Sequence, residues 1–200
     1  MIRVVIGSAA AAVAMFVIGF IFFGLGLQNL AMKSVGDMQA APIQQALRAN
    51  IADTGTYLVP GERTPEQTRM YGTGPVATIH YNVNGQVGGM NAGTALKGLI
   101  FNFAIALAFG LALIGIDGRV RDFGSRARVA AIIAVAAAAF THLGIPLYYP
   151  HDWAYYIYLF LADGISLAVA GMIVAWFIKV EPEPAVVGEA SPAERPADEV

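Results

Sequence analysis

The sequence predicts an all-α membrane protein with four transmembrane helices and a small α+β extramembrane insertion between helices 1 and 2. Of the 200 residues, 57% are hydrophobic and only 13% carry a charge. The mean hydropathy is +0.61. The apolar residues fall into four long runs, and about 20 apolar residues are enough for a helix to cross a bilayer. The polar residues 28–94 between the first two runs predict the insertion.

The first apolar run occupies residues 4–27 and follows Arg3. A cleaved secretory signal is the alternative, but its apolar region is shorter and ends in a small-x-small cleavage site. Residues 24–29 offer no convincing site of that kind. We therefore expect residues 1–27 to form an uncleaved first transmembrane helix.

Residues 28–94 combine a helical pattern with strand patterns. The helix is predicted by apolar residues at roughly helical spacing, and Pro42 predicts a break or a new start within it. Residues 55–59 and 76–83 are rich in β-branched and aromatic side chains, which predicts two strands, while Gly72 and Gly74 indicate turns. The apolar stripe of the helix comprises Val35, Met38, Ile43, Leu47 and Ile51.

The remaining spans are predicted at residues 95–116, 129–149 and 154–179, joined by loop 117–128 and turn 150–153. Small residues recur four apart in the second and third spans, which allows close backbone approach. We expect these two stripes to pack against each other. They comprise Gly98, Ala106 and Gly110 in the second span and Ala130, Ala134 and Ala138 in the third.

The distribution of arginine predicts the orientation. Loop 117–128 holds Arg119, Arg121, Arg126 and Arg128, whereas turn 150–153 holds neither lysine nor arginine. Short loops rich in these residues stay in the cytoplasm. Both termini are therefore expected in the cytoplasm and residues 28–94 in the periplasm of a cell inner membrane. The proline-rich acidic residues 180–200 predict a disordered cytoplasmic tail.

Four polar residues in the spans form a candidate intramembrane cluster: Asn102, His142, Tyr156 and Asp163. Ionisable residues inside a membrane are costly, and they face a bundle interior or a wet cavity. Asp163 lies ten residues after Trp153, which places it roughly 15 Å deep. His142 has a similar depth in the preceding span. Pro146 is expected to kink that span, because it cannot bond to the carbonyl of His142.

Three interpretations of this cluster remain open. It is a static hydrogen-bonded clasp between helices, a site that carries protons or a ligand, or a set of residues that never meet. Ser166 follows Asp163 at helical spacing and shares its side of the fourth span.

Other kinds of function find less support. The chain has no cysteine, and its three histidines have no metal-ligand spacing, so we expect neither a metal nor a cofactor. The chain has no basic patch interleaved with aromatic residues, so the sequence gives no sign of nucleic-acid binding. It also has no motif that pairs a nucleophile with a base and no paired carboxylates, so it gives no sign of catalysis. The sequence favours a non-enzymatic accessory or interaction subunit, with a membrane-protein partner or a second copy of itself. A small transporter or proton-linked channel using Asp163 and His142 is the alternative.

Overall fold

The computed structural model describes residues 1–85 and 91–178, and residues 180–200 of the predicted tail lie outside this part. It is mostly helical, with four helices long and apolar enough to cross a membrane. They span residues 2–24, 92–115, 123–148 and 153–177. A small α+β insert separates the first two, so the predicted fold class is confirmed.

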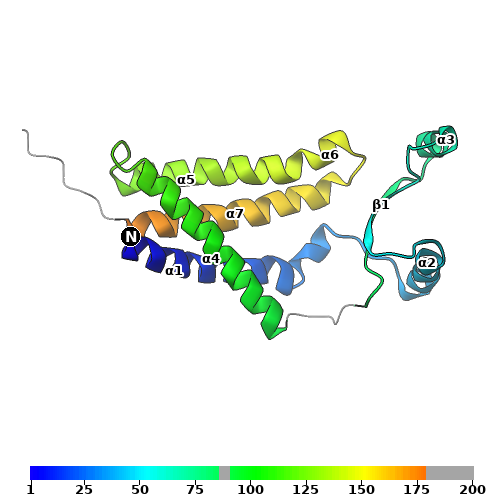
Figure 1. The fold of residues 1–200 in the computed structure, drawn as a ribbon, viewed down its shortest axis with the longest axis horizontal. Helices are drawn as coiled ribbons and strands as arrows, with labels where there is room; N and C mark the ends of the chain where they lie inside the picture. Colours follow the sequence, from blue (N-terminus) through cyan, green and yellow to red (C-terminus); the bar gives the residue numbers. More distant parts are fainter. Residues whose placement is uncertain (86–90, 179–200) are drawn as a thin grey trace, which may run out of the picture.

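Helix α7 (Trp153–Phe177) forms the centre of the bundle. α1 (Ile2–Gly19) packs along one side of it and α5 (Phe123–Ala138) along the other. α4 (Ala92–Gly115) crosses α1 and α7 obliquely and meets α5 only slightly (Figure 1). The start of α1, the α4–α5 loop and the end of α7 lie at one end of the bundle. The insert lies at the other (Figure 1).

Small residues allow the close contacts of the bundle. A Cβ atom built on Gly171 would lie 2.6 Å from the Cβ of Ala130, so α5 and α7 approach closely there. A Cβ on Gly110 would clash with Val4, which indicates the same for α4 and α1. Ala130, Ala134 and Ala138 are all buried.

The predicted pairing of the second and third spans is wrong. The alanine stripe of α5 is buried against α7, and the buried part of α4, Ala106 and Gly110, faces α1 and α7. Gly98 has open space where a Cβ would be. The physical reason is that a small-residue stripe marks a face for close approach without selecting the helix that approaches it.

Two of the spans contain a π-helical segment. The first span continues α1 with η1 (Phe20–Gly24), and the third continues α5 with η3 (Ala139–Leu143). After η3 comes the short α6 (Ile145–Tyr148), which contains Pro146. Because Pro146 has no amide hydrogen, the third span changes its winding here, at the place where a kink was expected.

The end of the bundle opposite the insert, here called the inner end, is held by Arg126, whose side chain is fully buried. Its guanidinium donates to the carbonyls of Val120 and Ile178 and pairs with the Asp117 carboxylate. One side chain thus ties α5 to the end of α4, the loop after it and the end of α7. The sequence pattern indicated only a topology role for this arginine.

Helix α5 begins at a capped residue. The Asp122 carboxylate accepts a hydrogen bond from the Ser125 amide at 2.8 Å. Hydrogen bonds from Ser125 lower the pKa of Asp122. The stabilisation is therefore present at neutral pH and is lost as the pH falls through this lowered value, when the carboxylate takes up a proton.

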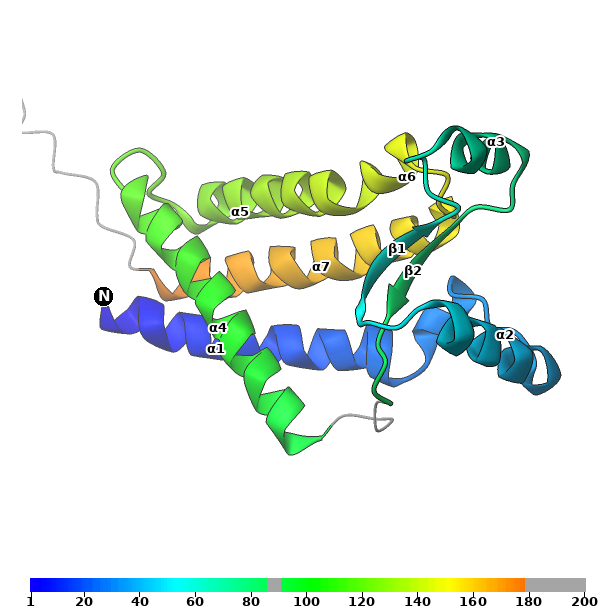
Figure 2. The same ribbon diagram turned by 45° about the vertical axis from the view of Figure 1, so that its right-hand side comes forward.

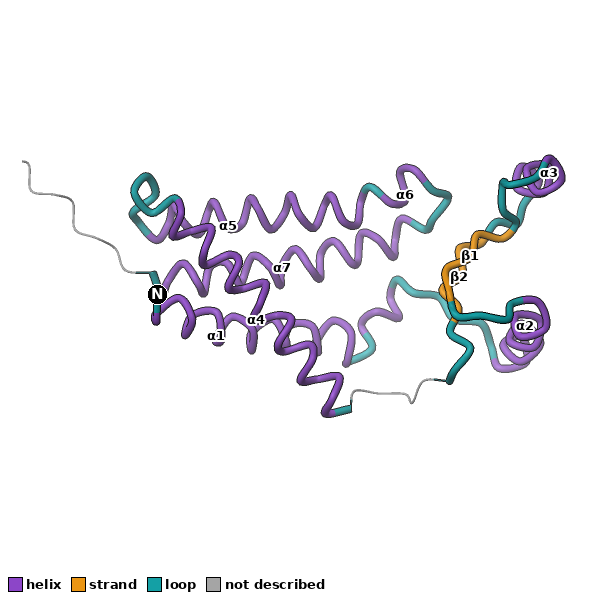
Figure 3. The backbone as a smooth tube through the Cα atoms, in the orientation of Figure 1, coloured by secondary structure: helices purple, strands orange, loops and turns teal. Residues whose placement is uncertain are grey.

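The insert contains a two-stranded antiparallel sheet of β1 (Gly55–Val59) and β2 (Ala77–Tyr81), in a register that pairs Tyr57 with Ile79. The strands are flanked by α2 (Asp37–Asn50) and α3 (Pro65–Thr73). A short 3-10 helix, η2 (Leu27–Leu30), leads from the first span into the insert. Figure 3 shows the two strands, in orange, between the bundle and these helices.

Two expectations for the insert were wrong. Pro42 lies inside α2 without breaking it, because the helix can lose one backbone hydrogen bond at an exposed position. Gly72 lies within helix α3 and not in a turn, so the helix was missed because glycine indicated a turn there. The signal for α3 is Thr64-Pro65-Glu66-Gln67, in which Thr64 caps the Gln67 amide and proline occupies the first turn.

Candidate functional site

The third and fourth spans are joined by a polar contact inside the bundle. Nε2 of His142 lies 2.6 Å from Oδ2 of Asp163, which is a hydrogen bond. η3 carries His142, so the π-helical turn determines where the imidazole reaches α7. π-Helical turns within α-helices occur frequently at functional sites.

This pair lines a cavity of about 310 Å³ to which all four spans contribute. Its polar lining gathers on α4, the third span and α7, and the rest of its wall is apolar. The side chain of Asp163 is 45% exposed although it is bonded to His142. The carboxylate therefore opens into the cavity instead of being enclosed between helices. The polar residues of the lining are Asn102, Thr141, His142, Asp163 and Ser166.

Of the four predicted cluster residues, the structure brings three to this cavity. His142 and Asp163 touch, and Asn102 lines the same cavity without a hydrogen bond to either of them. Tyr156 lies outside it and forms a hydrogen bond with His151 at 2.9 Å. Thr141 was not predicted, although it directly precedes His142; its hydroxyl donates to the carbonyl of Ala137.

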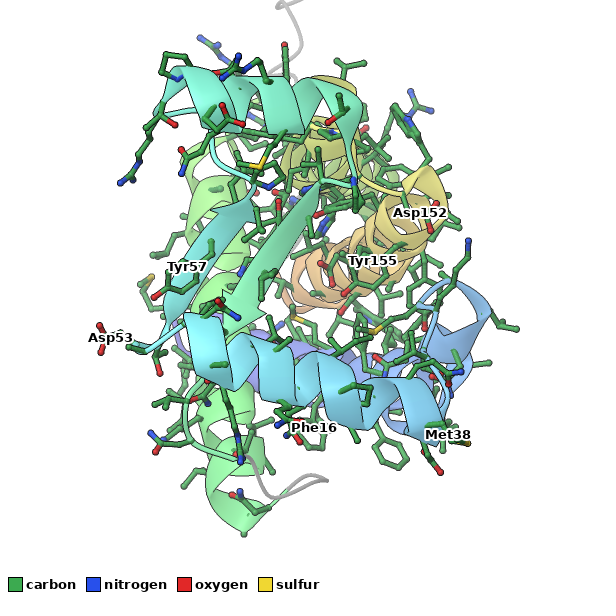
Figure 4. The ribbon with its side chains drawn as sticks, turned by 90° about the vertical axis from the view of Figure 1, so that its right-hand side faces the viewer. Phe16, Met38, Asp53, Tyr57, Asp152 and Tyr155 are labelled. Atoms are coloured by element: carbon green, nitrogen blue, oxygen red, sulfur yellow. The ribbon has the colours of Figure 1, made fainter. Side chains whose placement is uncertain are left out.

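A second, outer cleft of about 650 Å³ lies between the insert and the end of the α6–α7 hairpin. The insert contributes Thr78 and His80, and the hairpin contributes His151 and Tyr155. Figure 4 shows Tyr155 and Asp152 near the start of α7, behind the strands. Thr141 and His142 line this cleft as well as the inner cavity. These two neighbouring residues therefore lie between the two spaces.

His151 connects the insert to the bundle. Its Nε2 lies 3.1 Å from the hydroxyl of Thr78 on β2, and its Nδ1 bonds to the Tyr156 hydroxyl. Its ring is stacked between the rings of Tyr149 and Tyr156. A neutral imidazole has one donor and one acceptor nitrogen, and both are used here. The sequence suggested only a solvated turn at this position.

A further contact secures the first span. The hydroxyl of Tyr158 on α7 donates to the carbonyl of Phe22, which lies in the π-helical η1. The Tyr158 ring also makes edge-on contacts with the rings of Phe22 and Phe23. The sequence pattern offered no signal for this role of Tyr158.

Metal binding finds no geometric support in the part of the chain that the structure describes. Residues 1–85 and 91–178 contain no group of three histidine or acidic side chains placed to hold an ion. The outer-cleft histidines bond to hydroxyl groups: His80 to Thr56 and His151 to Thr78 and Tyr156.

Comparison with known proteins gives no relative: no family model, no curated protein and no solved structure matches this chain.

Proposed function

We propose that this integral membrane protein is a non-enzymatic interaction subunit of the cell inner membrane. In this proposal a partner membrane protein covers its insert. Both termini are placed in the cytoplasm and residues 28–94 in the periplasm.

The main observation behind the proposal is that the insert has no buried side chains among its described residues. None of the described residues 27–85 is buried, including all of α2 and α3. Neither helix packs substantially on the strands or on the bundle. Isolated segments of this size are marginal without a core, so a covering surface would contribute much of their stability.

The exposed surface has the composition of a contact surface. Leu30 and Met38 are 84% and 88% exposed, and Ile43 on the same helix as Met38 is 48% exposed. α2 and α3 cross the outer end of the bundle on either side of the strands (Figures 2 and 4), so a partner seated there would meet both. The insert carries no marked excess of charge, which favours an apolar contact.

The sidedness rests on the arginine-rich residues 117–128, which form the α4–α5 loop and the first turns of α5 at the end of the bundle opposite the insert. An alkaline phosphatase fused after Gln67, in the exposed α3, tests it. The enzyme folds in the periplasm, so an active fusion is expected there. An inactive fusion at this site and an active one after Arg121 would reverse the orientation.

Pull-down of the full chain in mild detergent tests the docking role. Met38→Asp with Ile43→Asp is expected to reduce recovery of the partner while the bundle keeps its melting temperature. Gln45→Asp, also exposed on α2, is the matched control and should leave recovery unchanged. Equal recovery with both variants would contradict docking through this surface.

A small transporter or proton-linked channel is the second candidate, and one observation favours it. The hydrogen bond between His142 and Asp163 lies at the wall of a cavity and is not enclosed between two packed helices. A carboxylate and an imidazole in hydrogen-bond contact can pass a proton between them. Replacing Asp163, as described in the Discussion, tests this role.

A further inference from the structure

The cavity between the four spans has more hydrogen-bond acceptors than donors in its lining. Asp163 uses Oδ2 for His142, and no second bond to this carboxylate is formed by the described residues. The hydroxyl of Thr141 donates a hydrogen bond to the carbonyl of Ala137, so its oxygen can still accept one. Asn102 and Ser166 add an amide and a hydroxyl that bond to no other described residue. A ligand that donates several hydrogen bonds complements this wall.

The opposite walls suit a hydrocarbon chain. They are formed by Met15 and Phe23 from the first span, Phe101 and Ile105 from α4, and Leu167 from α7. Phe101 is 65% exposed, and α4 diverges from α5 in this half of the bundle. An alkyl chain can therefore extend from the cavity toward the lipid.

The cavity is closed toward the inner end. Below it the spans meet in a core of small and aliphatic side chains, among them Ala106, Leu113, Ala170 and Val174. Each of these four side chains is at most 1% exposed. The polar wall continues only outward, through Thr141 and His142 into the outer cleft. A ligand head thus reaches Asp163 from the lipid side or from the insert side.

From these features we infer that the cavity binds a lipophilic primary amine, with its ammonium group on Asp163 and its alkyl chain against the apolar walls. This inference deepens the second candidate function, because it uses the same pair. It requires binding alone and no transport. It is independent of docking through the insert.

Asp163 and His142 are the two titratable residues among the described lining; the first span and α4 contribute none. The outer cleft, which His142 also faces, adds His80, His151, Asp152, Tyr155 and Tyr156. The ammonium group and the Asp163 carboxylate carry opposite charges, and pairing lowers the cost of each charge inside the membrane.

Octylamine is a suitable probe for the purified full chain in mild detergent. We expect saturable binding in calorimetry. Octanol keeps the chain but has no charge, and octyltrimethylammonium keeps the charge but donates no hydrogen bond. Both should bind about tenfold more weakly or worse, the loss expected for a charge-assisted hydrogen bond.

Variants separate the cavity from the detergent and from the outer cleft. Asp163→Asn is expected to remove the saturable component, whereas Asp152→Asn in the outer cleft, where asparagine can still cap α7, should leave it unchanged. If Asp163→Asn does not fold, Ser166→Leu, which fills the cavity, should weaken binding instead. Equal binding of octylamine by the parent and the folded variants, equal binding of all three probes, or only non-saturable partitioning would overturn the inference.

Discussion

Nε2 of His142 lies 2.6 Å from Oδ2 of Asp163 and joins the third and fourth spans within the apolar part of the bundle. Asp163 lies ten residues into α7, or roughly 15 Å from its outer end. Two ionisable side chains at this depth are costly unless they pair or face water. Here they pair with each other, and the carboxylate also opens into the cavity.

Substitution of Asp163 separates a clasp from a titrating site. Asp163→Asn should fold and assemble like the parent, because the amide still bonds to His142. Asp163→Leu leaves the imidazole without a partner and should lower the free energy of unfolding by about 1–3 kcal/mol. Thermal stability, complex recovery and growth of the host are measured for both variants.

Growth then decides the role of the pair. A folded, assembled Asp163→Asn variant that fails to support growth indicates proton or ligand handling, since an amide does not titrate. Normal growth of that variant indicates a clasp. If Asp163→Leu proves as stable and active as the parent, the Asp163 carboxylate has neither role.

Close packing at glycine should be sensitive to a single methyl group. Gly171→Ala places a Cβ 2.6 Å from that of Ala130, so overpacking should cost about 1–3 kcal/mol. Gly98→Ala is the control, because that position is open, and alanine should gain up to about 1 kcal/mol from its higher helix propensity. Unfolding in mixed micelles measures both. Equal stability of the two variants would contradict the α5–α7 contact.

Arg126 should contribute more to stability than the neighbouring Arg128, which also lies in the first turns of α5. Arg126→Met removes the bonds to Val120, Ile178 and Asp117, and it should cost about 3 kcal/mol. The exposed Arg128, changed to methionine, should alter the free energy of unfolding by less than about 0.5 kcal/mol. Comparable losses in the two variants would indicate a general effect of charge instead of a buried contact.

The sequence predicted the parts of this fold that depend on hydropathy and local pattern. Four apolar runs became four spans, and strand-type residues 55–59 became β1. The contact of His142 with Asp163 was recognised as a possibility, because helical rise gave both a similar depth. Rotation about each helix axis decides whether two side chains meet, and spacing alone does not give that rotation.

The remaining features depend on tertiary contacts. The alanine stripe of α5 was identified, but its partner was not, because stripes on α1, α4 and α7 all offer small residues. Arg126 resembles Arg119, Arg121 and Arg128 in the sequence, and only the fold buries it. His151 acquires its role from Thr78, which is far away in the chain.

Loss of the His151 imidazole should loosen the insert without weakening the bundle. His151→Phe can keep a ring between Tyr149 and Tyr156, but it loses the hydrogen bond to Thr78. The chain has no cysteine, so spin labels on cysteines introduced at Asn50 and Arg121 report the distance between insert and inner loop.

The distance distribution for this pair of labels should broaden in His151→Phe, while the melting temperature of the bundle stays unchanged. His80→Phe is the control, because the hydrogen bond to Thr56 that it removes joins only β2 to β1 within the insert. A distribution as narrow as the parent's in His151→Phe would show that other contacts hold the insert.

The central claim, that the exposed insert is covered by a partner protein, is tested most directly by site-specific photocrosslinking in cells. A photoreactive residue replaces Met38 or Ile43 on α2, and Gln45 on α2 and Ile132 on α5, which is 61% exposed, serve as controls. The account predicts one discrete product from Met38 and Ile43 that is weaker from Gln45 and missing from Ile132. A product of twice the chain mass would identify a second copy as the partner. No product from Met38 or Ile43, or equal products from all four positions, would contradict the claim.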